Sequence, residues 1–254
     1  MTWQEHYINR YYPKTKGWID GTTEFHNLCT SEIPSGSLIL EIGAGPSNPT
    51  SRFLGSIGKV VGLDIDPIVT TNKYLSAAYV LEEGDSYPFD DDSFHACVSD
   101  YVLEHLAAPT AHLAQVSRVL KPRGVYVFRT PNRFHYTALV GKATPHWFHE
   151  LVANRLRNLG PSAHAPHPTF YRLNSRGAIT KTAESVGLIV RELRMVEKEP
   201  SYGMSSRLLF KVFMTYERIV NRFEVFSGFR ANIFGVLEKA SQSHSSLTLR
   251  GGPS

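Results

Sequence analysis

Acidic side chains stand inside or at the end of strand-like apolar runs in the first half of the chain. Glu41 lies within SLILEIG (37–43), Asp64 ends KVVGLD (59–64) and Asp100 ends SFHACVSD (93–100). Carboxylates attract cations and accept hydrogen bonds from hydroxyls. Because parallel strands end at a common edge, these groups predict an acidic crevice for a ligand that is part cation. For Glu41 taken alone, a structural role in accepting backbone hydrogen bonds is the alternative.

Two glycines, Gly43 and Gly45, follow Glu41 in the stretch EIGAGPSN. Glycine lets the chain turn sharply and approach a ligand closely, and a helix that follows offers unpaired N–H groups. A dinucleotide-binding loop would place a third glycine where Asn48 stands, so that pyrophosphate can lie on the helix N-terminus. With Asn48 at that position and a carboxylate nearby, a pyrophosphate ligand is disfavoured.

The spacing of the next acidic residue indicates a nucleoside. Asp64 stands about twenty residues beyond the glycines, where a carboxylate can accept both hydroxyls of a ribose, as it also does in NAD enzymes. Asp85 then ends the run AAYVLEEGD (77–85), and Tyr101 follows Asp100. Polar groups therefore collect at successive strand ends, which is where open sheets bind ligands.

The elements that position these residues alternate between strand-like and helical patterns. A fifth run, GVYVFRT (124–130), completes the first set, and LIVRELRMVE (188–197) and FGVLEKA (234–240) predict two further strands. Helices are expected from Pro67, over AHLAQVSRVL up to Lys121-Pro122, and over NSRGAITKTAESVG with an Asn or Ser cap. This alternation predicts an α/β fold with a parallel sheet.

A chain of 254 residues suits one α/β domain with insertions. We expect an N-terminal helical cap over 1–36, a ligand-binding core over 37–132, and a lid or pocket wall over 133–173. Residues 174–240 would complete the same fold with a helical insertion at 205–226, and the polar tail 241–254 would be disordered.

Composition and charge limit the cell compartment and the partners. No apolar run approaches the roughly 18 residues of a membrane span, the start lacks a signal-peptide pattern, and Cys29 and Cys97 are not in CxxC spacing. These features predict a cytoplasmic protein. Residues 1–132 carry 10 Lys and Arg against 15 Asp and Glu, whereas residues 133–254 carry 17 against 8. The basic half indicates either a solvated surface or an acidic partner, but no nucleic-acid-binding module accompanies it, and RNA is the minor option.

Four motifs together resemble the class I S-adenosylmethionine-dependent methyltransferases with a compact Rossmann-like domain. They are EIGAGPS, GLDIDP, GDSYPFDDDSFHACVSDYVLEHL and RVLKPRGVYVFRTPN, and they cover about residues 37–132. The resemblance implies a seven-stranded, mostly parallel sheet whose last strand is antiparallel, with helices on both faces and helical insertions near the C-terminal half. It also implies S-adenosyl-L-methionine as cofactor. Ser47, Asn48 and Arg123 depart from the family pattern, in which glycine is frequent.

The resemblance carries over site residues one by one. It implies that Glu41 to Gly45 form the methionine-side loop, that Asp64 holds the ribose and that Asp85 with Ser86 addresses the adenine, while Asp100 and Tyr101 flank the methionine. The residues so implied to bind the cofactor are Glu41, Gly43, Ala44, Gly45, Asp64, Ile65, Asp85, Ser86, Asp100 and Tyr101.

Methyl transfer by in-line displacement requires alignment of the acceptor and, for a protonated acceptor, a base. His105, in YVLEHL, is the candidate general base, with a packed or capping histidine as the alternative. On the substrate side we expect His135, Trp147, His149 and Tyr171, and the N-terminal tyrosines Tyr7, Tyr11 and Tyr12 are candidates for a cap across the cofactor. HWFHE and HAPH lack a third convincing ligand, so no metal is predicted.

The segment 205–226 is amphipathic and basic. It could cover the sheet edge, form a homodimer contact or lie on an anionic membrane. The leading hypothesis for the whole chain is methylation of a small molecule, most simply at an oxygen of a secondary metabolite, sugar or lipid-like precursor. An NAD(P)-dependent oxidoreductase and a non-catalytic S-adenosylmethionine-binding module are the alternatives.

Overall fold

The computed structural model describes residues 2–82, 84–136, 168–200 and 203–241. Its centre is a seven-stranded sheet in the order β3-β2-β1-β4-β5-β7-β6. The strands are β1 (Ser37–Ile42), β2 (Gly58–Asp64), β3 (Ala77–Val80), β4 (Phe94–Asp100), β5 (Leu120–Pro131), β6 (Leu188–Val196) and β7 (Asn232–Lys239). β7 runs antiparallel to both of its neighbours, and the other pairings are parallel. This confirms the predicted fold class.

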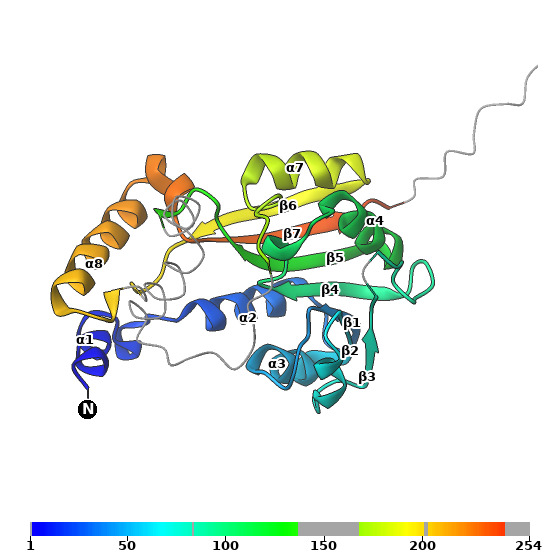
Figure 1. Ribbon diagram of the computed structural model, residues 1–254, viewed down its shortest axis with the longest axis horizontal. Helices are drawn as coiled ribbons and strands as arrows, with labels where there is room; N and C mark the ends of the chain where they lie inside the picture. Colours follow the sequence, from blue (N-terminus) through cyan, green and yellow to red (C-terminus); the bar gives the residue numbers. More distant parts are fainter. Residues whose placement is uncertain (1, 83, 137–167, 201–202, 242–254) are drawn as a thin grey trace, which may run out of the picture.

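Helices cover both faces of the sheet (Figure 1). On one face α2 (Gly21–Glu32) and α3 (Pro49–Ile57) bury Phe25, Leu28, Cys29 and Leu54 against β1, β4 and β5. On the other face α4 (Pro109–Val119) and α7 (Arg176–Ser185) bury Leu113, Val116, Ile179 and Ala183. The central strands are apolar on both sides because each side is covered, as parallel sheets require.

Two further helices lie away from these layers. α1 (Trp3–Tyr11) and α8 (Arg207–Arg222) lie side by side beyond the edge of the sheet at which β4 and β6 end (Figure 1). The ring of Phe210 on α8 contacts Trp3, Tyr7, Tyr11 and Tyr12, with ring centroids 5.4 to 6.5 Å away. The Tyr12 hydroxyl also donates a hydrogen bond of 2.9 Å to the buried carboxylate of Glu217. The N-terminal tyrosines therefore pack against α8.

Short 3-10 helices complete the description: η1 (Lys14–Lys16), η2 (Pro67–Thr71), η3 (Leu103–His105) and η5 (Glu224–Phe229). The helix expected from Pro67 is thus only the single 3-10 segment η2, in which the Asp66 side chain accepts from the Ile68 N–H. The third strand ends at Val80 and does not reach Asp85, because Val80 pairs with Asp64, the last residue of β2; the chain then turns at Gly84, which has a φ of +95°. The fifth strand is longer than expected and begins at Leu120.

Arg123 lies within β5 with a φ of +64°. A left-handed backbone conformation favours glycine, because other residues bring their Cβ close to the backbone. The departure from glycine noted in the sequence therefore leaves a strained arginine at this position.

Candidate active site

The candidate site is built around the turn that follows β1. Gly43 has a φ of +69°, and a Cβ built there would lie 2.3 Å from Cγ2 of Val102. Gly45 has a φ of +54°, with open space around it. Glycine is thus required twice by the backbone, and at Gly43 also by the close approach of the segment after β4.

Asn48 explains the missing third glycine. Its Oδ1 accepts from the N–H groups of Thr50 and Ser51, both at 2.9 Å, so it caps α3. Its Nδ2 donates to the carbonyl oxygens of Ala44 at 2.8 Å and Pro46 at 3.0 Å. One side chain therefore closes the helix N-terminus and holds the loop. The N–H groups that a pyrophosphate would use are already taken.

Asn72 supports the same loop from the other side, a role that the sequence analysis missed. Its buried amide donates to the carbonyl oxygens of Gly45 and Pro46 at 3.2 Å and to the Ser51 hydroxyl at 2.9 Å. An asparagine directly after a short helix carried no signal in the sequence, because its partners are about 25 residues away and only the fold brings them together.

Glu41 is buried below the turn, with 4% of its surface exposed. Its Oε1 accepts a hydrogen bond of 3.0 Å from Ser51, while Oε2 has no hydrogen-bond partner within the described part of the chain. The pKa of Glu41 is raised to about 8, mainly by burial; the Ser51 hydrogen bond lowers it, and the charges of Asp100 and Asp64 contribute to the increase. A cation brought next to this group would favour its ionised form.

Asp64 joins the turn to the end of β2. Its Oδ2 accepts from the Gly45 N–H at 2.8 Å and its Oδ1 from the Asp66 N–H at 2.9 Å. Each carboxylate oxygen keeps a further lone pair that a ligand hydroxyl can use. The next residue, Ile65, is 57% exposed and offers an apolar surface beside it.

Asp100 at the end of β4 is held by protein partners. Arg129, at 7% exposure, donates to both of its oxygens, with Nη2 to Oδ2 at 2.8 Å and Nε to Oδ1. The Thr50 hydroxyl donates to Oδ2 at 3.0 Å. Sequence reasoning missed Arg129, although an arginine near the end of the apolar run GVYVFRT was a usable signal.

Tyr101 follows with a φ of +59°. Its N–H donates to the carbonyl oxygen of Arg129, its hydroxyl donates to Asn232 at 3.0 Å, and the Arg129 guanidinium lies 4.8 Å from its ring centroid. A tyrosine held in the left-handed region costs about 1 to 3 kcal/mol, and such residues concentrate at functional sites. Asp100 and Tyr101 thus form a fixed wall beside the turn.

Asp85 and Ser86 lie in the exposed segment after β3, at the same sheet edge. The Ser86 hydroxyl accepts a long hydrogen bond of 3.5 Å from Gln115 on α4. The structure joins Glu41, Asp64, Asp100 and the turn through shared hydrogen bonds, whereas Asp85 and Ser86 stand apart from this network.

The comparisons with known proteins agree with this geometry. Residues 40–128 match a family described as a methyltransferase domain. An uncharacterized methyltransferase of Mycolicibacterium vanbaalenii is 30% identical over 103 residues, which is 39% of this chain and 40% of that protein. A ubiquinone/menaquinone biosynthesis C-methyltransferase of a Marinomonas species is 28% identical over 120 residues, 42% and 48% of the two chains. The chain thus spans less than half the length of these curated relatives.

A solved structure extends the likeness to the fold of almost the whole chain. Geranyl diphosphate C-methyltransferase from Streptomyces coelicolor A3(2), in complex with Mg²⁺, geranyl diphosphate and S-adenosyl-L-homocysteine, has a TM-score of 0.56 and 13% identity. The similarity covers 86% of this chain and 80% of that one. Residues 40–128 carry the methyltransferase domain, in the class I S-adenosylmethionine-dependent fold. The sequence resemblance is confirmed.

In this methyltransferase domain His105 is the last residue of η3 and lies five residues after Asp100 in the chain. Its Nδ1 lies 2.9 Å from the carbonyl oxygen of Pro168. Because a carbonyl oxygen only accepts, Nδ1 carries a proton in this contact. A catalytic role for His105 stays a prediction.

Glu104, next to His105, is a buried group that the sequence analysis missed. Its carboxylate accepts from the Thr130 hydroxyl at 3.1 Å, and its carbonyl oxygen accepts from the N–H groups of Phe170 and Tyr171. Burial raises the pKa of Glu104 to about 7. Glu104 thus fixes the start of the segment that carries Tyr171, whose φ is +52°.

The predicted substrate-side residues lie in different places. His135 is 3% exposed, lies 3.4 Å from Glu197 and packs on the rings of Tyr136 and Tyr216. Trp147 and His149 lie outside the described residues. Over the described ranges no group of three His, Cys, Asp or Glu side chains could hold a metal ion, and the absence of a metal stays a prediction. No helix in these ranges is long and apolar enough to cross a membrane.

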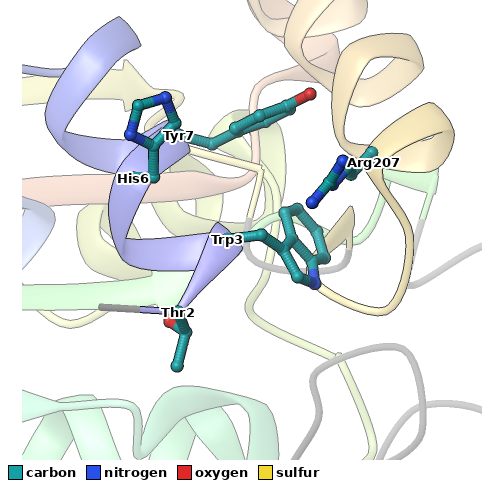
Figure 2. A pocket seen from close by; sticks show the side chains of 5 residues that line it. All are labelled: Thr2, Trp3, His6, Tyr7 and Arg207. Carbon is teal, nitrogen blue, oxygen red and sulfur yellow. The ribbon is translucent and has the colours of Figure 1, made fainter.

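A cavity of about 450 Å³ lies between α1 and α8. It is lined by Thr2, Trp3, His6, Tyr7 and Arg207, and Figure 2 shows the Trp3 and Tyr7 rings turned toward Arg207. None of these residues belongs to the turn after β1. The predicted acidic site at that turn is therefore defined by its hydrogen-bond network, and this cavity does not include it.

Proposed function

We propose that the protein is an S-adenosyl-L-methionine-dependent methyltransferase that acts on a small lipid-like acceptor. The observation that carries the cofactor assignment is the pairing of a capped α3 with a buried acidic group: Asn48 occupies the helix N–H groups and Glu41 lies below the turn. This arrangement disfavours the diphosphate of NAD and favours a nucleoside with a cationic end. It therefore supports the methyltransferase over the oxidoreductase.

Fit to the cofactor is supported residue by residue. Asp64 would accept the ribose hydroxyls, the turn Gly43–Gly45 would lie against the methionine portion, and Asp85 with Ser86 would bind the adenine. Asp100 accepts hydrogen bonds from Arg129, so its role would be to hold Tyr101 in position beside the turn. When bound, the cofactor would supply a methyl group on a positively charged sulfur. The chain's contribution would be to orient the acceptor, exclude water and accept a proton at Nε2 of His105.

The lipid-like acceptor class is taken from two similar proteins. One similar protein is named as a C-methyltransferase of ubiquinone/menaquinone biosynthesis and another as geranyl diphosphate C-methyltransferase, and geranyl diphosphate joins an apolar chain to an anionic group. We propose an oxygen as the acceptor atom, and the product of the experiment below would identify it.

The test begins with binding. Calorimetry should show binding of S-adenosyl-L-methionine or S-adenosyl-L-homocysteine and none of NADH. Asp64→Asn should weaken this binding at least tenfold, equivalent to about 1.4 kcal/mol, whereas the exposed Asp90→Asn should not. Absence of cofactor binding in the wild type would refute the proposal.

Catalysis is tested separately with methyl-labelled cofactor and a lipid extract, followed by mass spectrometry of labelled products. His105→Gln should lower kcat by 10² or more while the affinity for cofactor is unchanged, the range expected on removing a general base. Binding without any transfer would favour the non-catalytic module. Equal kcat in His105→Gln and wild type would remove His105 from the mechanism.

A further inference from the structure

Helix α8 carries two parallel rows of side chains. The apolar row is Leu208, Val212, Ile219 and Phe223, with exposures of 72, 53, 44 and 53%. Each member is preceded by a cation, so the basic row is Arg207, Lys211, Arg218 and Arg222. At about 100° per residue, the apolar row spans about 60° of the helix circumference and the basic row runs alongside it. The helix therefore has an apolar stripe and a basic stripe next to each other.

These rows are not needed for the contacts that hold α8 in the fold. The opposite side of the helix buries Phe210, Glu217 and Val220. Phe210 packs into the rings of α1, and Glu217 accepts hydrogen bonds from Tyr12 and Asn221. Two members of the basic row face α1: the Nη2 of Arg218 donates to the carbonyl oxygen of Tyr11, and Arg207 lines the cavity with Trp3 and Tyr7.

The exposed apolar surface continues beyond the helix end into η5. Val225, Phe226 and Phe229 are 82, 40 and 48% exposed. Within α8 the one carboxylate, Glu217, is buried, and the exposed carboxylate that follows, Glu224, pairs with Arg230 at 2.8 Å. The surface is therefore apolar along one line and cationic along the next.

We propose that α8 and η5 form a docking surface for an anionic lipid bilayer. The apolar row would enter the headgroup region, and Lys211 and Arg222 would meet lipid phosphates. The charge decides for a bilayer over a second copy of the chain, since two copies joined through this face would bring two basic rows together, whereas anionic headgroups neutralise them. The proposal does not depend on methyl transfer. α8 follows β6 at the carboxyl edge of the sheet. Docking would therefore place α8 between the bilayer and that edge.

The experiment is co-sedimentation of the full chain with vesicles of phosphatidylcholine alone and of phosphatidylcholine with about one third phosphatidylglycerol. Binding is expected to the anionic vesicles only and to fall as salt is raised. Leu208→Ser with Phe223→Ser, and separately Lys211→Glu with Arg222→Glu, should each reduce the bound fraction at least tenfold. Ile189→Ser, an exposed apolar position on β6, and Lys181→Glu on α7 are the matched controls and should bind as the wild type does.

Circular dichroism and thermal unfolding confirm that the variants fold. A wild type that stays in the supernatant with anionic vesicles would overturn the proposal, as would equal losses in the control variants. Light scattering tests the alternative that a second copy of the chain occupies this face. The face would be a subunit interface if the wild type is a dimer, if Leu208→Ser with Phe223→Ser dissociates it, and if vesicle binding is unchanged. Loss of vesicle binding with intact cofactor binding would support the docking surface independently of the proposed activity.

Discussion

Two carboxyl groups in and beside the candidate site are buried. Glu41 and Glu104 both have raised pKa values, to about 8 and about 7, because each is buried. A carboxyl with a raised pKa holds its proton in the folded state and loses it earlier in the unfolded state. Stability from this source is present below the unfolded pKa of about 4.3 and declines as pH rises toward the folded value.

Glu41→Gln is expected to stabilise the cofactor-free protein at high pH. The amide keeps an oxygen for the Ser51 hydroxyl and carries no charge to bury. The gain relative to wild type should be small near pH 5 and grow to a few kcal/mol as pH approaches about 8. Thermal unfolding of both proteins across this range measures it, and a gap that does not widen with pH would contradict the raised pKa of Glu41.

Cofactor binding should also report on Glu41. If the sulfonium cofactor favours the ionised carboxylate, wild type will release a proton on binding below about pH 8, and its affinity will rise with pH up to that value. Calorimetry in two buffers of different ionisation enthalpy counts this proton. Glu41→Gln, as the matched variant, should lose this part of the proton release.

The Asp100–Arg129 ion pair allows a structural role of Asp100 to be distinguished from a role in contacting the ligand. Arg129 is buried, so Asp100→Asn should leave a cation without its counter-charge and destabilise the cofactor-free protein by about 3 to 5 kcal/mol. Denaturant unfolding without cofactor measures the change. If Asp100 served only to touch the ligand, this measurement would show no loss.

At the scale of elements, the turn between β1 and α3 contains glycines required for two reasons, backbone conformation and lack of space for a Cβ. Both Gly43 and Gly45 have positive φ, but only at Gly43 would a Cβ meet Val102. Gly45→Ala should cost about 1 kcal/mol of unfolding free energy from backbone strain alone. Gly43→Ala should cost clearly more, by about 1 to 3 kcal/mol for the overlap. Equal losses would show that Val102 moves aside without cost.

At the scale of the whole molecule, α1 is attached to α8 by one buried hydrogen bond and a group of rings. Tyr12→Phe removes the hydroxyl that donates to Glu217 and leaves that buried carboxylate with less support. We expect a loss of about 1 to 3 kcal/mol. Hydrogen exchange should quicken in α1 and α8 and not in β1 or β4. Tyr79→Phe, at an exposed position on β3, is the control.

Much of the fold could be predicted because its signals are local. Runs of apolar residues bounded by turns defined the seven strands within a few residues, and helix caps such as Ser175 followed ordinary rules. The errors were also local in cause. The strand that begins at Ala77 stops early because its partner β2 ends at Asp64, opposite Val80, and Arg123 extends β5 through a conformation that its residue type does not favour.

The sequence by itself determined the acidic residues at strand ends, the glycine turn and the disfavoured pyrophosphate, because each depends on residue type and spacing along one stretch. Only the tertiary structure decided which of those groups share hydrogen bonds. It paired Asp100 with Arg129, brought Asn72 to the turn and set the N-terminal tyrosines against α8. These partners are far apart in the chain, so packing and burial, and not sequence pattern, select them.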